Sequence, residues 1–171
     1  MATTEILLPV LGASLDATDP PGRGWTTTDG TPYLAFNGTT SAPDEICYWS
    51  FRLPTLLDNA TAPTLTIQWS NSTTNTNNVV WQCQVSKVAP SSDTDDMTAA
   101  RTYDTTNKAA ADAGVGTRQL QEVVITLTNF DSADAGDKVY LKFFRDPDDA
   151  GDTMGEDAYI YSEAVFTYTL V

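Results

Sequence analysis

Hydrophobic and polar residues alternate along most of this chain with a period of two. Cys47 and Trp49 share one face of the run EICYWSFRL, and Tyr48 lies on the other. This period, together with many β-branched and aromatic residues, is typical of β-strands. The pattern predicts strands at Tyr33–Phe36, Glu45–Leu53, Leu65–Trp69, Val79–Val88, Leu120–Leu127, Lys138–Arg145 and Ala158–Leu170.

The last two predicted strands carry large apolar residues on both faces. Phe143 and Phe144 point to opposite sides of the first, and Val165 and Phe166 do so in the second. A strand that is apolar on both faces is covered on both. We therefore expect the core on one side of these strands and a neighbouring sheet or subunit on the other.

The expected fold is all-β. No stretch has a helical period long enough for repeated parallel crossovers, so the strands are expected to be antiparallel. The Ala-rich residues 108–113 predict a short helix or turn, and residues 22–31 around Trp25 have turn chemistry. The 171 residues fit one antiparallel jelly-roll-like β-sandwich domain over residues 22–171, preceded by an extended N-terminal arm over residues 1–21.

The N-terminal arm ends in two prolines, which cannot continue a strand ladder. Before them lies a short apolar stretch whose residues are candidates for partner binding: Ile6, Leu7, Leu8, Val10 and Leu11. Such a segment either pairs with an edge of its own domain or docks on a partner. The sequence favours neither alternative.

The chain is strongly acidic. It has 23 Asp and Glu residues against 9 Lys and Arg residues, a net charge of −14. Nucleic acids and anionic membrane surfaces bind clustered cations, so neither is an expected partner. There is no apolar run of the roughly 18 residues that a transmembrane helix needs. Met1–Leu11 contains Glu5 and no basic residue, unlike a signal peptide.

The residue types of common catalytic sites are missing. The chain has no histidine, which excludes Ser-His-Asp and Cys-His catalysis and most zinc sites. No glycine-rich loop has phosphate-binding spacing, and no carboxylate pair is held at the separation that glycoside hydrolysis needs. We expect no enzyme activity and no organic cofactor. Cys47 and Cys83 fall on inward faces, where they are either free buried thiols or a disulfide between adjacent strands.

One acidic loop between the last two strands has the character of a ligand site. It reads DPDDAGDTMGED and spaces four carboxylates at Asp146, Asp148, Asp152 and Asp157. Counted from Asp146, Gly151 stands at position 6 and Asp157 at position 12, as in a calcium loop. The twelfth residue is not Glu, however, and strands rather than helices flank the loop. It is either a calcium-binding hairpin loop or a turn whose Asp side chains cap their own backbone.

Aromatic side chains that reach the surface can stack on glycans, and the candidates here are Trp25, Tyr33 and Tyr48. The alternative is that these rings belong to the core or to an interface.

Several short runs occur in a recognisable order along the chain. They are YWSFRLP at Tyr48–Pro54, LTIQWS at Leu65–Ser70, NNVVWQCQV at Asn77–Val85, VYLKFFRDPDDAGDTMGEDAYI at Val139–Ile160 and FTYTL at Phe166–Leu170. In this order they resemble small all-β structural proteins of tailed bacteriophage particles, of the capsid decoration or cement type. The resemblance covers about two-thirds of the chain, from Tyr48 onward. Asp149 stands where the family pattern has Asn, and Phe144 where it has Tyr.

The resemblance implies a jelly-roll virion protein without catalytic residues. The expected role is capsid decoration, in which a homotrimer on the outer surface of the capsid binds the major capsid protein and stabilises the shell. Burial of apolar side chains and strand pairing across subunits would hold such an assembly together. The alternative is a glycan- or receptor-binding appendage module of a phage head or tail, because one fold serves many functions.

Overall fold

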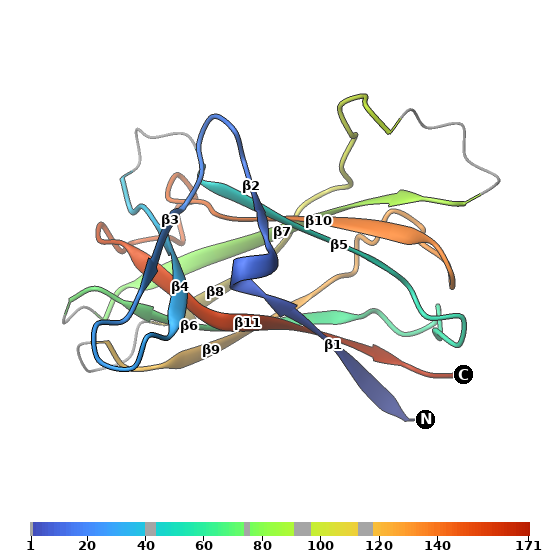
Figure 1. The fold of residues 1–171 in the computed structure, drawn as a ribbon, viewed down its shortest axis with the longest axis horizontal. Helices are drawn as coiled ribbons and strands as arrows, with labels where there is room; N and C mark the ends of the chain where they lie inside the picture. The colour runs from blue at the N-terminus through green and yellow to red at the C-terminus, as the bar shows by residue number, and fades with distance from the viewer. Residues whose placement is uncertain (1, 40–43, 74–75, 91–96, 113–117) are drawn as a thin grey trace.

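The structure is a computed structural model that describes residues 2–39, 44–73, 76–90, 97–112 and 118–171. Its strands form two antiparallel sheets (Figure 1). Sheet A contains β1 (Thr3–Pro9), β3 (Gly22–Trp25), β4 (Pro32–Phe36), β6 (Thr64–Asn71), β9 (Gln121–Thr126) and β11 (Ala158–Thr169). Sheet B contains β2 (Ser14–Leu15), β5 (Ile46–Arg52), β7 (Asn78–Val88), β8 (Asn107–Asp112) and β10 (Lys138–Arg145). A short 3-10 helix, η1 (Val10–Gly12), follows β1.

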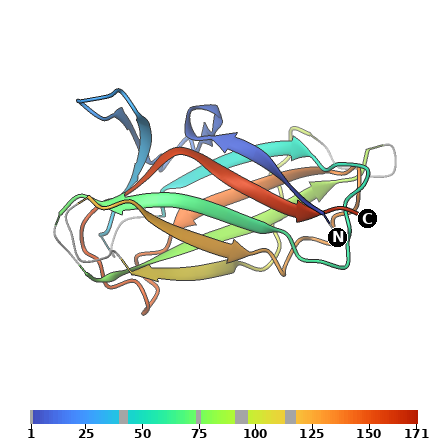
Figure 2. The same cartoon turned by 90° about the horizontal axis from the view of Figure 1, so that it is seen from below.

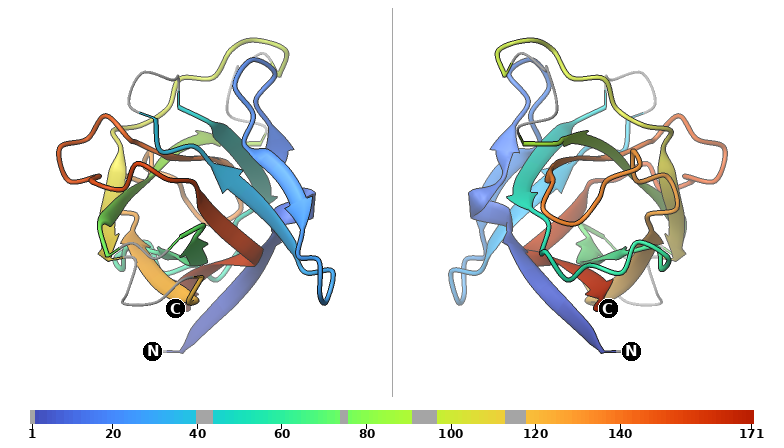
Figure 3. Two further views of the ribbon diagram at one scale, coloured as in Figure 1. Left: turned by 90° about the vertical axis from the view of Figure 1, so that its left-hand side faces the viewer. Right: turned by 90° about the vertical axis from the view of Figure 1, so that its right-hand side faces the viewer.

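The two sheets face each other, and the chain passes repeatedly from one to the other. Sheet A has the order β3-β4-β11-β6-β9 with β1 paired to β11, and sheet B has the order β2-β5-β10-β7-β8. Figure 3 looks along the strands and shows them wrapped round a common interior. The predicted all-β, antiparallel, jelly-roll-like sandwich is confirmed. In the part of the chain that the structure describes, no helix is long and apolar enough to span a membrane.

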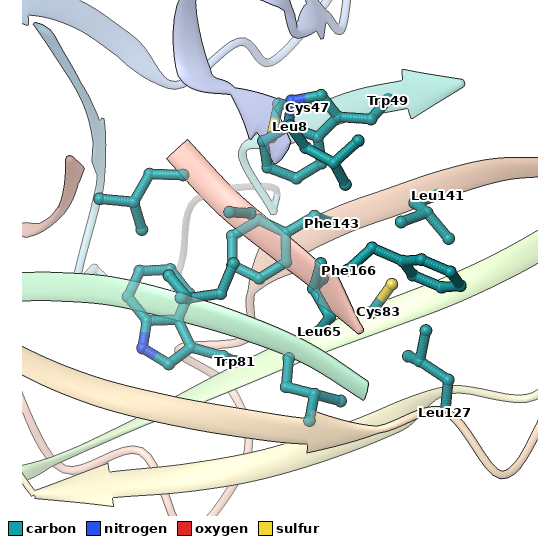
Figure 4. Packing of buried hydrophobic residues seen from close by; sticks show 14 of the residues in the cluster. Leu8, Cys47, Trp49, Leu65, Trp81, Cys83, Leu127, Leu141, Phe143 and Phe166 are labelled. Carbon is teal, nitrogen blue, oxygen red and sulfur yellow. The ribbon is translucent and has the colours of Figure 1, made fainter. Parts of the chain in front are cut away.

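The inward faces of the sheets meet in one hydrophobic core (Figure 4). Trp69 on β6 and Trp81 on β7 come from opposite sheets, and their ring centroids lie 5.8 Å apart in an edge-on contact. Phe143 on β10 stacks on Trp81 with centroids at 5.3 Å. Both tryptophans are fully buried.

β11 is the strand around which sheet A is built. One edge of β11 pairs with β6, and the other edge pairs first with β4 and then with β1. The change of partner occurs at a β-bulge between Ile160 and Ala164, where Ser162 has a φ of +53°. A bulge bends its strand and increases the local twist. The bend allows β4 and β1 to occupy successive parts of the same edge.

The segment predicted as an N-terminal arm, residues 1–21, contributes to both sheets. β1 pairs with β11 over its whole length, and β2 joins sheet B beside β5. Of the two alternatives, pairing with its own domain is the one observed. Leu8 and Val10 are buried in the core and Ile6 is partly buried. Leu7 and Leu11 are 55% and 45% exposed, so these two are the apolar residues of the segment that a partner can reach.

Two predictions of local structure are wrong. The described part of residues 108–113, predicted as a short helix or turn, lies in β8. The buried Asn107 side chain donates to the carbonyl oxygens of Cys83 and Asn129, at 3.2 and 2.8 Å, which anchors β8 beside β7. Pairing with a neighbouring strand overrides the helix preference of alanine. Gly22–Trp25, predicted as part of a turn, is the edge strand β3.

The acidic loop is not a hairpin loop, because β10 and β11 belong to different sheets. It crosses from sheet B to sheet A.

The outer face of β10 was predicted to be covered by a neighbouring sheet or subunit. In the structure, a loop of the same chain lies against this face. The Arg101 guanidinium lies 3.9 Å from the ring centroid of Tyr140, and the Lys142 ammonium lies 5.9 Å from that of Tyr103.

Both cysteines are free and buried, and Figure 4 shows them among the core side chains. Cys47 on β5 and Cys83 on β7 pair with the same residue of the strand between them, Phe143. Two strand spacings, about 10 Å, therefore separate the cysteines, whereas a disulfide needs Cα atoms within about 7 Å. Burial raises the pKa of the Cys83 thiol to about 12 and also raises that of Cys47.

Candidate functional site

A cleft of about 610 Å³ opens beside the bulge of β11, on the outer side of sheet A. We call it the aromatic cleft. Its apolar surface comes from Trp25, Tyr33, Leu120, Tyr159 and Tyr161. Its polar surface comes from Asp29, Gln68, Arg118, Ser162 and threonines of the β3–β4 turn. Apolar walls with a few polar groups are typical of sites for small ligands.

The β3–β4 hairpin forms one wall of the cleft, and it projects from the body of the sandwich (Figure 2). Trp25 ends β3 and is 56% exposed. The turn is closed by Asp29, whose Oδ1 accepts the backbone N–H of Thr31 at 3.1 Å and the hydroxyls of Thr31 and Thr26. These hydrogen bonds, that from Thr26 first, hold the pKa of Asp29 below its usual value. Gly30, at a φ of +70°, supplies the left-handed residue that the turn needs.

Three tyrosines from two adjacent strands form the floor. The ring centroid of Tyr33 lies 5.1 Å from that of Tyr159 and 6.0 Å from that of Tyr161, both in edge-on geometry. Such pairs are favourable beyond their buried area. The Tyr161 hydroxyl lies 3.0 Å from the Ser70 hydroxyl, within hydrogen-bonding distance. Burial, and to a smaller extent the Asp157 carboxylate, raises the pKa of the Tyr159 phenol.

Gly24 gives the Tyr33 ring room to lie across β3. A Cβ atom at Gly24 would lie 2.6 Å from both Cζ and the hydroxyl oxygen of Tyr33. Gly22 lies two residues earlier, on the same face of the strand. A Cβ there would meet the Ala35 Cβ at 3.5 Å, an ordinary van der Waals contact. Gly24 is therefore the residue that permits the position of Tyr33.

Two non-glycine residues of the cleft have a left-handed backbone. Arg118 has a φ of +58° and Ser162 a φ of +53°. This conformation costs about 1–2 kcal/mol per residue, and such residues concentrate at binding and catalytic sites. The backbone N–H of Arg118 donates to Oδ1 of Asn71 at 3.1 Å, which fixes this residue at the rim.

The structure brings together two of the three aromatic residues that the sequence proposed for glycan stacking. Trp25 and Tyr33 meet in the cleft, whereas Tyr48 lies on sheet B. Sequence reasoning missed Tyr159 and Tyr161 as site residues. In β11 they lie on the face opposite the buried Ile160. Their approach to the β3–β4 hairpin depends on the order of the strands, which the sequence does not determine.

The acidic loop is held by a buried ion pair. The Arg145 guanidinium contacts both carboxylate oxygens of Asp152, at 2.8 and 2.9 Å, and each side chain is 1% exposed. The same guanidinium donates to the backbone oxygens of Met154 and, at 2.6 Å, of Glu156. Asp152 also accepts the backbone N–H of Val80 at 3.0 Å. Its carboxylate is fully engaged in holding the loop.

The other predicted calcium ligands are not gathered round Asp152. Asp146 accepts the backbone N–H of Asp148 at 3.2 Å and the side-chain amide of Gln82, so it caps its own loop. Among the residues described, no three His, Cys, Asp or Glu side chains lie where they could hold a metal ion. The structure therefore does not unite Asp146, Asp148, Asp152 and Asp157 in one site, which favours the second alternative, a turn whose Asp side chains cap their own backbone.

A second cavity, of about 520 Å³, lies among the loops at the other end of the sandwich and has a single ring, Phe130, in its wall. The Asn59 side chain donates to the Asp134 carboxylate there, so part of its polar surface is already paired. The aromatic cleft is the stronger candidate.

No protein-family model matches this chain, and no curated protein matches it. Among solved structures, the chain is similar to the CBM22-1 xylan-binding domain of Xyn10C from Paenibacillus barcinonensis. The TM-score is 0.50 at 12% identity, over 100% of this chain and 99% of that one. TmCBM27, a carbohydrate-binding module with specific mannan recognition, matches with a TM-score of 0.48 at 10% identity over 99% of each chain. A chain of infectious bursal disease virus, Gx strain, matches with a TM-score of 0.42 at 9% identity, over 99% of this chain and 32% of that one. At these identities the comparisons bear on the fold alone, and of these three the xylan-binding domain carries that argument.

Proposed function

We propose that this protein is a non-catalytic carbohydrate-binding module and that the aromatic cleft is its binding site. The observation that carries the proposal is the convergence of Trp25 and three tyrosine rings beside a small set of polar groups. The β-sandwich fold is one that a xylan-binding domain also has, which is compatible with this role without deciding it.

Trp25 supplies the main stacking surface. A sugar ring presents apolar C–H faces and polar hydroxyl edges, which suit an aromatic ring flanked by hydrogen-bonding groups. Trp25 is 56% exposed, so a sugar that covers it removes apolar area from water. Covering about 100 Å² at about 25 cal/mol per Å² contributes about 2.5 kcal/mol.

The polar groups of the cleft fix the orientation of the sugar. The Gln68 amide and the Ser162 hydroxyl each donate and accept hydrogen bonds. The Tyr159 phenol, neutral at neutral pH as tyrosines ordinarily are, adds an O–H donor. These groups match the hydroxyls at the edge of a sugar ring, while the rings of the floor match its face.

A glycan array with a matched pair of variants tests the proposal. Trp25→Ala removes the exposed ring, and Leu56→Ala is the control, because Leu56 is 57% exposed and does not line the cleft. We expect the native protein and the control to bind the same glycans. Trp25→Ala is expected to bind at least about tenfold more weakly, since tenfold corresponds to about 1.4 kcal/mol. A folded native protein that binds no glycan, or undiminished binding by Trp25→Ala, would overturn the proposal.

Capsid decoration is the second candidate function, and the sequence resemblance and one edge of sheet A support it. Among the residues described, β11 is the only strand that pairs with β1, so the other edge of β1 remains available for strand pairing with another subunit. Leu7 lies opposite Val165, Val165 opposite Thr66, and Thr66 opposite Val124. This uncharged row beside an open edge suits association with further copies, as in a homotrimer, or with a major capsid protein. The protein would then lie on the outer surface of a phage particle, with its glycan site available to the host.

Light scattering and particle composition test this second candidate. We expect the native chain to associate in solution, and Leu7→Asp to shift it toward monomer by placing a charge in the row. The amount of this chain relative to the major shell protein in purified particles distinguishes the two virion roles. A high copy number supports decoration, a few copies per particle indicate a tail or vertex appendage, and absence from particles overturns a virion role.

A further inference from the structure

The aromatic cleft is bordered by carboxylates beyond those in its lining. Among the residues described as lining it, Arg118 is the one cation and Asp29 the one carboxylate. Glu122 lies opposite Gln68 on the adjacent strand, on the same exposed face. Glu163 follows the rim residue Ser162 and is exposed.

A further carboxylate, Asp157, stands two residues before Tyr159 in the chain, and after burial it raises the pKa of the Tyr159 phenol. Asp29 is held ionised by the hydrogen bonds within the β3–β4 turn. Besides Asp29 in the lining, three carboxylates, those of Glu122, Asp157 and Glu163, thus belong to residues opposite or close in sequence to lining residues, and Arg118 is the one guanidinium described in the lining. The chain as a whole has a net charge of −14.

We infer that the aromatic cleft selects uncharged polysaccharides and rejects those that carry carboxylates or sulfates. The inference rests on the proposed carbohydrate-binding function and names its ligand class. A uronic acid or sulfated sugar placed on the tyrosine floor meets more carboxylates than guanidinium groups, so its own charge is repelled. A neutral sugar keeps the stacking and hydroxyl contacts without that repulsion. The long-range field acts in the same direction, because an acidic protein slows the approach of a polyanion.

A matched pair of polymers separates charge from sugar geometry. The first is a neutral polysaccharide that the native protein binds on the array, and the second is the same polymer lightly carboxymethylated. At an ionic strength of about 10 mM, where screening extends over about 30 Å, we expect the carboxymethylated polymer to bind at least tenfold more weakly. Near 1 M salt the screening length is about 3 Å, and the difference is expected to narrow to a few-fold.

Two double variants, each of which removes two negative charges, show where the repulsion of the carboxymethylated polymer originates. Glu122→Gln with Glu163→Gln removes two carboxylates beside the cleft, and Glu5→Gln with Asp148→Asn removes two that do not line or adjoin it. The first pair is expected to raise binding of the carboxymethylated polymer, relative to the neutral one, by more than the second pair does. Equal effects of the two pairs would overturn the local origin of the selectivity.

The outcomes distinguish a wrong ligand class from a wrong carbohydrate-binding function. Equal or tighter binding of the carboxymethylated polymer at low salt overturns the ligand class and leaves carbohydrate binding intact. Binding of neither polymer, by a folded protein, overturns the carbohydrate-binding function and the ligand class together.

Discussion

Replacing Gly24 with alanine tests whether the position of the Tyr33 ring determines binding. The added Cβ would lie 2.6 Å from Cζ and the hydroxyl oxygen of Tyr33, well inside the usual 3.5–4.0 Å separation of carbon atoms. Gly24 does not have a positive φ, so its backbone accepts alanine. The Tyr33 ring therefore has to move away from β3, and no group that would touch a ligand has been removed.

The cost follows from the contacts that Tyr33 leaves. Its edge-on contacts with Tyr159 and Tyr161 are each worth about 0.5–1.5 kcal/mol, so losing both costs about 1–3 kcal/mol. Alanine in place of glycine returns about 0.4–1 kcal/mol by restricting the unfolded chain. The free energy of unfolding should therefore change by between nearly zero and a loss of about 2.5 kcal/mol. Affinity should fall at least about tenfold, because one wall of the stacking surface is displaced.

Gly22→Ala is the matched control, since its Cβ would make an ordinary 3.5 Å contact with the Ala35 Cβ. Urea denaturation gives the stability of each variant, and isothermal titration with the glycan found on the array gives its affinity. We expect Gly22→Ala to bind as the native protein does, with equal or slightly higher stability. An unchanged affinity in folded Gly24→Ala would refute the role of the Tyr33 ring in the site.

Three further predictions concern the core and the acidic loop. Asp152→Asn leaves the buried Arg145 guanidinium without its carboxylate and should lower the free energy of unfolding by about 3–5 kcal/mol in urea denaturation; a loss below about 1 kcal/mol would contradict the anchoring role of the pair. Cys47 and Cys83 should resist alkylation in the native protein at mildly alkaline pH and react in denaturant, because both are buried and their pKa values are raised; labelling of either thiol in the folded chain would contradict their burial. Millimolar calcium should leave the melting temperature unchanged, because the Asp152 carboxylate already binds the Arg145 guanidinium, and a clear rise would show that the acidic loop binds the ion after all.

The sequence predicted the strands that carry a strict alternation of apolar residues. β5, β7 and β10 have bulky aromatic or β-branched residues on their inward faces, and these faces are buried. β8 was missed because its inward residues, Asn107 and two alanines, carry no such signal. What fixes β8 is the hydrogen bonding of the Asn107 side chain to residues distant in the sequence, which no local pattern records.

The aromatic cleft was predictable only in part. Trp25 and Tyr33 were recognised as candidate stacking residues, but their meeting with Tyr159 and Tyr161 requires β4 to pair with β11 rather than with another strand. That pairing joins segments far apart in the chain, Tyr33 with Tyr161 and Ala35 with Tyr159. The spacing of carboxylates in the acidic loop indicated a calcium site, yet it could not show that Asp152 would be paired with Arg145.

A nuclear magnetic resonance titration of the tryptophan indole N–H signals tests the central claim most directly. The chain has 4 tryptophans, and Trp25 is 56% exposed while the other three are at most 4% exposed. Adding a bound neutral oligosaccharide should shift the Trp25 indole signal saturably and leave the three buried indoles in place. Saturable binding without a shift of the Trp25 signal would contradict the assignment of the aromatic cleft as the carbohydrate site.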